Sequence, residues 1–244
     1  MELHDVTTAL YILQKHNIAD DVLVVVSKES AYSVETLMRY IENIGSEGEV
    51  GFAACDLFML YMKSCEVKED TPHDLVVDCL AKTILSNRDN KEILMKLLET
   101  FQALKDCCMI LEQEQADAFV DCWMSVSKQY KDDAEILLEL LKVFGVMVCT
   151  IDLYDAVIRS GVYSYVPDLM GAHTNSVEIQ IMGFSGLLFV LGYKEDSDFS
   201  DDFLKSIVSH MNEMCLMYFW NDIFAEVVEA LKKTLQAKYG VAGF

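Results

Sequence analysis

Histidine, cysteine and acidic residues are the side chains of this 244-residue chain that could carry chemistry. The five histidines, at positions 4, 16, 73, 173 and 210, form neither an HExxH motif nor a His–Cys spacing typical of zinc ligands. The chain has no P-loop, GxSxG or GxGxxG sequence. Carboxylates are plentiful, but nothing in the sequence places a pair of them in a closed pocket, which general acid–base catalysis needs. We therefore expect no catalytic residues, no cofactor and no enzymatic activity.

The eight cysteines are expected to be reduced thiols that neither pair nor bind metal. The opening residues 1–5 lack the basic and apolar regions of a secretory signal, so a reducing compartment is expected. Cys107 and Cys108 are the only adjacent pair, and we expect a structural role for them. Cys79 and Cys122 could approach each other, yet they too are most simply small core residues.

An acidic stretch at residues 194–202 partly imitates a calcium-binding loop. Asp196, Asp198 and Ser200 have the spacing of its first ligands. The sixth position is Asp201 instead of glycine, and the twelfth is Ile207 instead of glutamate. The stretch is therefore expected to be a solvated loop that caps the following helix.

The composition indicates a soluble, helical, cytoplasmic protein. The formal net charge of −21 disfavours nucleic acids and anionic membranes, and it is compatible with a partner protein that carries basic segments. The longest apolar run, residues 181–190, is shorter than a membrane span and indicates a buried helix. Two prolines in the whole chain favour helices over a turn-rich β-sandwich.

A repeat of 43 residues organises the chain. Four aligned segments each begin with a glutamate, namely Glu49, Glu92, Glu135 and Glu178. A second set of positions has the same spacing: Leu37, Leu80, Trp123 and Val166. With one extra residue the pattern extends to Asp222 near the C-terminus and to Asp5 near the N-terminus. Such a period predicts an all-α fold of about five to six stacked units in one domain over residues 1–244.

Each unit is expected to hold a second helix, a polar break and a longer third helix. The second helices are predicted over residues 34–44, 75–87, 117–129, 162–172 and 202–215. The breaks at 87–90, 132–133 and 174–176 carry the Asn, Asp and Ser residues that start helices. Two columns of the third helices are apolar and predict the core: Val50, Ile93, Ile136 and Ile179, and Phe58, Phe101, Phe144 and Leu187.

Residues 158–192 resemble an armadillo repeat. Gly161 stands at the turn after a short first helix, Pro167 lies inside the second helix, and Asn175 precedes the third. Gly183 and Gly186 stand for the small residues that let the family's helices approach closely. The resemblance implies a right-handed α-solenoid of armadillo/HEAT-like repeats that binds a partner protein on the concave face of its third helices.

The family's nuclear-import adaptors line this face with Trp and Asn, and that ladder is missing here. The Trp positions hold Asp56, Glu99, Lys142 and Ser185, and the Asn positions hold Leu60, Ala103, Val146 and Phe189. The partner-binding residues predicted on this face are Asp56, Leu60, Lys96, Glu99, Glu139, Lys142, Met182, Ser185 and Phe189. An alternative is a structural building block that packs through its ends, where residues 10–13 and 241–244 are apolar.

Overall fold

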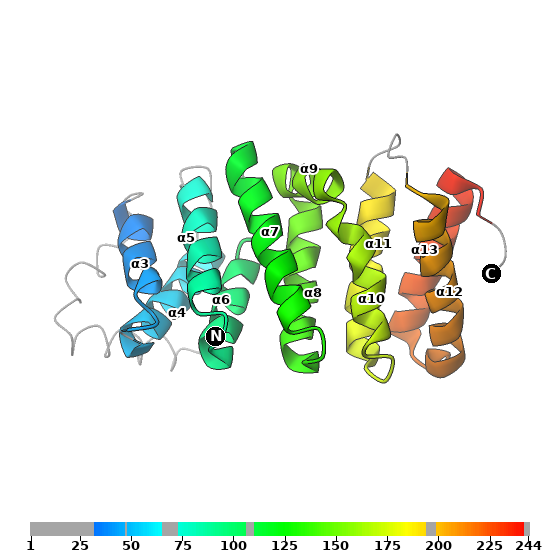
Figure 1. Ribbon diagram of the computed structural model, residues 1–244, viewed down its shortest axis with the longest axis horizontal. Coiled ribbons are helices and arrows are strands. Elements are labelled where there is room, and N and C mark those ends of the chain that lie inside the picture. Colours follow the sequence, from blue (N-terminus) through cyan, green and yellow to red (C-terminus); the bar gives the residue numbers. More distant parts are fainter. Residues whose placement is uncertain (1–31, 47, 65–72, 106–109, 194–198, 242–244) are drawn as a thin grey trace. The chain divides into compact units, whose positions relative to one another are not determined.

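The computed structural model describes residues 32–46, 48–64, 73–105, 110–193 and 199–241 (Figure 1). Every regular element in these ranges is helical, and none of them contains a β-strand. The predicted all-α class is therefore confirmed. Contacts divide the described residues into two compact units. The first unit runs to Val126 and includes Thr150–Asp152, and the second unit comprises Ser127–Cys149 and the residues from Leu153 onward.

The first unit is built from two layers of helices. Its helices are α3 (Tyr32–Glu42), α4 (Gly48–Ser64), α5 (His73–Ser86), α6 (Lys91–Gln102) and most of α7 (Gln113–Gln129). Helix α3 packs on α5 and α4 packs on α6, while α3 with α4 and α5 with α6 form antiparallel pairs (Figure 1). Phe101 of α6 stacks on Phe119 of α7 with ring centroids 4.0 Å apart. The apolar residues between the layers form the core of this unit.

The second unit has the same two-layer construction. Its helices are α8 (Ala134–Cys149), most of α9 (Ile151–Ser160), the 3₁₀ helix η1 (Val162–Tyr165), α10 (Val166–Gly171), α11 (Val177–Tyr193), α12 (Asp201–Tyr218) and α13 (Asp222–Tyr239). Helix α11 packs against both α8 and α13, and α10 packs against α11 and α12. Gly161 takes φ of +69° at the turn between α9 and η1, a conformation that favours glycine.

The residues predicted for the core are buried. The two apolar columns of the third helices are at most 7% exposed, and Phe58, Phe101, Phe144 and Leu187 are fully buried. Leu37, Leu80, Trp123 and Val166 are at most 2% exposed. Burial of these positions explains their apolar character, because each contributes free energy by leaving water.

The polar breaks act as helix caps, as predicted. The Asn90 side chain accepts a hydrogen bond from the Ile93 amide at 3.3 Å, and the Asp133 carboxylate accepts from the Ile136 amide at 3.2 Å. Ser176 accepts in the same way from the Ile179 amide at 3.4 Å. Each bond satisfies an amide that the first turn of a helix leaves without an intrahelical partner. Ser200 also caps α12, at its Phe203 amide.

Several details differ from the sequence predictions. Helix α7 begins at Gln113, earlier than predicted, because the Asp152 and Asp74 carboxylates accept bonds from the Leu111 and Glu112 amides just ahead of it. The third helices are not consistently longer than the second: α6 has 12 residues and α5 has 14. The second helix predicted over 162–172 is interrupted, with 3₁₀ geometry up to Tyr165. Residues 1–31, 106–109, 194–198 and 242–244, with the predictions made on them, lie outside the described part.

Candidate functional site

The predicted partner-binding residues of the first unit lie on α4 and α6. The Lys96 ammonium of α6 forms an ion pair with the Asp56 carboxylate of α4. Both side chains are half-buried, so this pair ties the two helices together as much as it faces solvent. Leu60 is half-buried and Glu99 is exposed. This part of the predicted site offers one exposed carboxylate beside a neutralised pair.

The predicted residues of α8 also neutralise each other. The Lys142 ammonium lies 2.5 Å from the Glu139 carboxylate, one turn back along the helix. Only 11% of the Glu139 side chain is exposed, against 36% of Lys142. Val146, which stands at one of the Asn positions of the predicted binding face, is buried. Of the predicted binding face on α8, mainly the Lys142 side chain is therefore accessible to a partner.

The predicted residues of α11 form its most accessible apolar part. Met182 and Ser185 are partly exposed, and Phe189 is 50% exposed. The three residues follow one another at helical spacing, so they lie along one side of α11. Tyr193, one turn beyond Phe189, is 55% exposed and packs against Tyr154 with ring centroids 4.9 Å apart. Helix α11 thus combines a buried side with a surface stripe that ends in two aromatic rings.

Two glycines bring the buried side of α11 close to its neighbours. A methyl group on Gly186 would lie 2.6 Å from the Phe144 ring of α8, and one on Gly183 would collide with the Met170 side chain of α10. The close approach expected for these small residues is therefore seen at both positions. These contacts show which side of α11 is buried against α8 and α10.

Two of the described histidines, His173 and His210, take part in hydrogen bonds, whereas the Nε2 atom of the buried His73 has no hydrogen-bond partner. In the second unit, Gln180 is fully buried, and its amide nitrogen donates to the Met170 and His173 carbonyls. Its oxygen then accepts from His210, whose Nε2 lies 2.7 Å away. Burial lowers the pKa of His210 below its ordinary value and favours the neutral ring. His73, in the first unit, is buried as well, and burial lowers its pKa.

The described cysteines are free, and three of them are buried. Burial raises the pKa of the Cys55 thiol to about 11 and the pKa of the Cys79 and Cys122 thiols to about 12. Cys79 donates to the Met38 carbonyl at 3.5 Å, and Cys122 donates to the Ala81 carbonyl at 3.6 Å. Thiols with such pKa values are protonated at neutral pH. Cys79 and Cys122 donate to different carbonyls and do not bond to each other. Their chemistry is that of packed core residues.

Two further observations concern metal binding and membrane insertion. Within the described ranges, no group of three or more His, Cys, Asp or Glu side chains is arranged to hold a metal ion. Among the helices that the structure describes, none combines the length and the hydropathy needed to cross a membrane.

Sequence reasoning missed a second exposed apolar surface, at the turn between α12 and α13. Leu216, Phe219, Trp220 and Ile223 are each at least 62% exposed. The signal was present in the sequence, because the other breaks between second and third helices are polar whereas this one contains Phe219 and Trp220. Comparison of the chain with models of protein families, with curated proteins and with solved structures found no match.

Proposed function

We propose that this chain is a non-enzymatic scaffold, an α-solenoid of armadillo/HEAT-like repeats. It binds a partner protein through the predicted partner-binding residues of its third helices, which we call the third-helix stripe. The observation that carries the proposal is Phe189, a phenylalanine held half-exposed on α11 in line with Met182 and Ser185. Aromatic side chains are enriched in protein interfaces, where they contribute a large share of the binding free energy. In the second unit, Lys142 of α8 supplies a charged group among the predicted partner-binding residues.

Hydrogen bonds that recur at the sequence period support the repeat architecture. In the first unit, the donors Cys79 and Cys122 are 43 residues apart, and so are the carbonyls of Met38 and Ala81 that accept from them. In the second unit, the carbonyls of Lys131 and Thr174 are also 43 residues apart. They accept from His173 and from the Tyr218 hydroxyl, each at 2.7 Å. The two cysteine bonds match in donor and in acceptor spacing, as stacked copies of one unit would. The His173 and Tyr218 bonds match in acceptor spacing alone, because these donors are 45 residues apart.

The state of the titratable groups supports binding over catalysis. Buried thiols with raised pKa values are poor nucleophiles, because the thiolate is the reactive form. The Gln180 amide is fully used in bonds to two carbonyls and to His210, so it holds helices together. A cytoplasmic partner with basic segments remains the best match to a chain of net charge −21.

The proposal is tested by a photo-crosslinking residue at Ser185. Crosslinked proteins from the native source are identified by mass spectrometry, and the affinity of the purified partner is then measured. We expect Phe189→Ala to weaken binding by more than about 1 kcal/mol while the melting temperature stays nearly unchanged, because a half-exposed ring contributes little to the core. The matched control is Ile151→Ala, a 61% exposed apolar residue outside the stripe. Equal affinity of the Phe189 variant and the control would exclude the α11 stripe as the interface.

A second candidate function is a building block that packs side chains of its last two helices into a larger assembly. The observation that favours it is the exposure of Leu216, Phe219 and Ile223 on α12 and α13. This candidate predicts that the purified chain associates with itself in sedimentation experiments. A monomer over the micromolar range would favour the scaffold.

A further inference from the structure

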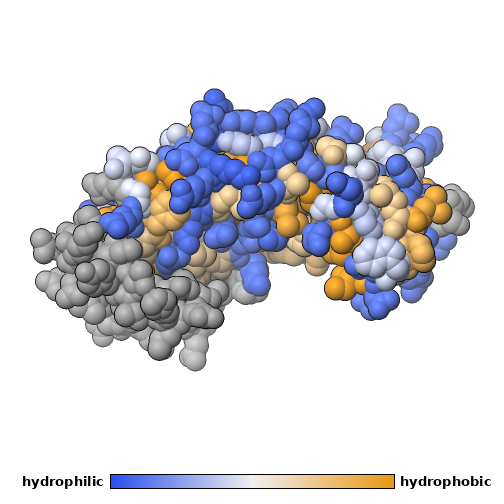
Figure 2. All heavy atoms as spheres, turned by 90° about the horizontal axis from the view of Figure 1, so that it is seen from below, coloured by the Kyte–Doolittle hydropathy of each residue, from blue (hydrophilic) through white to orange (hydrophobic). Residues whose placement is uncertain are grey.

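The turn between α12 and α13 carries a continuous set of exposed apolar side chains, which we call the turn patch. Its members are Leu216 (81% exposed), Met217 (43%), Phe219 (79%), Trp220 (62%) and Ile223 (62%). Figure 2 views the molecule from the side on which α12 ends, and orange and pale side chains gather there among blue ones. Single exposed apolar residues are ordinary on protein surfaces, but a cluster within eight residues indicates an interaction site.

The backbone beneath the turn patch is held in place. The Trp220 indole N–H donates to the Met217 carbonyl at 3.1 Å, and the Asn221 amide donates to the Tyr218 carbonyl at 3.0 Å. The Asn221 side chain caps α13 by accepting from the Phe224 amide at 2.9 Å. Tyr218, between the exposed residues, is buried and donates its hydroxyl proton to the Thr174 carbonyl. The exposed rings therefore stand on an ordered support, which lowers the entropy lost when a partner binds.

The turn itself does not require these side chains. The corresponding turns at 87–90 and 130–133 close with exposed polar residues such as Arg88, Asp89 and Asp132. Asn221 supplies the cap at the α12–α13 turn, just as Asn90 does for α6. Phe219 adds neither the cap nor core packing, because 79% of it stays in solvent. Trp220 contributes one bond, to the Met217 carbonyl, and leaves 62% of its side chain in solvent. Both rings are therefore open to contact with another molecule.

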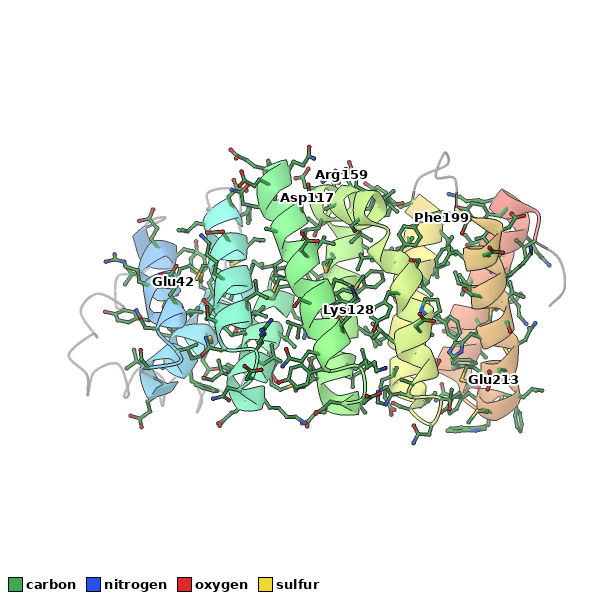
Figure 3. The ribbon with its side chains drawn as sticks, viewed as in Figure 1. Glu42, Asp117, Lys128, Arg159, Phe199 and Glu213 are labelled. Carbon is green, nitrogen blue, oxygen red and sulfur yellow. The ribbon has the colours of Figure 1, made fainter. Side chains whose placement is uncertain are left out.

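The charge around the turn patch is negative. No lysine or arginine occurs between Lys205 and Lys232, whereas Glu213, Asp222 and Glu226 are exposed in that interval. Figure 3 shows Glu213 close to the end of α12, where ring-bearing side chains extend beyond the helix. Acidic groups beside an exposed apolar cluster favour a ligand whose own apolar groups are flanked by cations.

We propose that the turn patch is a docking site for a basic amphipathic segment of a partner protein, whose apolar face covers Phe219 and Trp220. Its lysine or arginine side chains lie against Glu213, Asp222 and Glu226. A second copy of the chain is disfavoured, because self-contact would bring three carboxylates of each copy together with no basic residue of the turn to offset them. An anionic membrane is disfavoured by the same charges. This site goes beyond the α11 stripe of the proposed function and does not depend on it.

The test uses the full chain and two synthetic helical peptides with the same leucine pattern, one with lysine and one with glutamate at the remaining positions. Trp220 is the natural reporter, because Trp123, the other tryptophan, is buried and gives a constant background that a Trp220→Phe variant measures. We expect the lysine peptide to bind and to shift the Trp220 emission to the blue, with at least tenfold weaker binding in Phe219→Ser. Leu216→Ser is the second variant, since Leu216 is 81% exposed and its loss leaves the core intact.

Matched controls distinguish peptide binding at the turn patch from nonspecific binding to exposed apolar residues and from binding at the α11 stripe. Ile110→Ser, at a residue that is 79% exposed, and Phe189→Ala should both leave the affinity for the lysine peptide unchanged. Glu213→Gln combined with Glu226→Gln should weaken binding, and added salt should do the same.

Four outcomes would overturn the proposal. These are no binding of the lysine peptide, equal binding of the glutamate peptide, a Trp220 shift with phosphatidylcholine vesicles instead of peptide, and a dimer that Phe219→Ser dissolves. The vesicle result would assign the patch to a membrane surface, and the dimer would assign it to a second copy.

Discussion

At the scale of the residue, the buried cysteines show how this chain uses groups that are reactive elsewhere. Cys79 and Cys122 are 43 residues apart in the sequence, and each donates to a carbonyl of a neighbouring helix. Desolvation raises their thiol pKa values to about 12, because burial disfavours the charged thiolate. At both positions the cysteine acts as a small, buried side chain with a weak hydrogen-bond donor.

These thiols are expected to resist alkylation in the folded protein. At pH 8 a thiol with a pKa of about 11 or 12 holds very little of the reactive thiolate, and burial also hides Cys55, Cys79 and Cys122 from the reagent. Iodoacetamide should therefore modify Cys149 first, because this thiol is exposed, although partial burial raises its pKa as well. Peptide mass spectrometry after timed quenching measures the order. In denaturant all should react at similar rates. Comparable alkylation rates at Cys79 and Cys149 without denaturant would contradict the burial of Cys79.

At the scale of the element, glycine does two different things inside the third helices of the second unit. Gly186 of α11 faces the Phe144 ring, and the contact leaves no room for a methyl group. Gly145 of α8 has no neighbouring atom within 4 Å of the place where a methyl group would lie. One glycine therefore permits a helix–helix contact, while the other only costs helix stability.

The pair gives opposite expectations for the same chemical change. Gly145→Ala should raise the free energy of unfolding by about 0.5–1 kcal/mol, because alanine is the better helix former. Gly186→Ala should lower it by about 1–3 kcal/mol, since Phe144 is fully buried and the core must shift to accept the methyl group. Urea unfolding followed by circular dichroism measures both. A stabilised Gly186 variant would mean that α8 and α11 are farther apart than the structure places them.

At the scale of the whole molecule, the net charge of −21 bears on solubility, and the proposed repeat architecture bears on overall shape. Charge of one sign keeps chains apart in solution, which suits a protein with exposed rings such as Trp220. A stack of repeats, as proposed, would bury its apolar faces locally and would need no single central core. An extended stack and a globule with the same helices differ most in their overall dimensions.

Small-angle X-ray scattering tests the proposed solenoid. A compact globule of this length would have a radius of gyration of about 18 Å, and a stack of five to six units should exceed that value with an asymmetric distance distribution. A variant that begins at residue 32 controls for the contribution of the N-terminal residues. A radius near the compact value for that shorter variant, about 17 Å, would rule out an extended stack.

The sequence by itself determined the helices and their buried faces. The 43-residue columns predicted burial of Phe58, Phe101 and Phe144, and the Asn90, Asp133 and Ser176 caps were read from residue type alone. These features are local: apolar spacing selects the buried side of a helix, and a short polar side chain satisfies the amides of its own first turn.

Only the tertiary structure decided which polar and apolar residues of the predicted site are accessible. The sequence treats Asp56, Glu139 and Phe189 as members of one stripe, yet Asp56 is paired with Lys96 of another helix, Glu139 is mostly buried, and Phe189 is half-exposed. The exposure of Phe219 and Trp220 was likewise decided by the packing: an apolar break in the sequence marks the position, but helical periodicity does not tell whether a neighbouring helix covers an apolar residue. Exposure is a property of the packed neighbours, and residues far apart in the sequence set it.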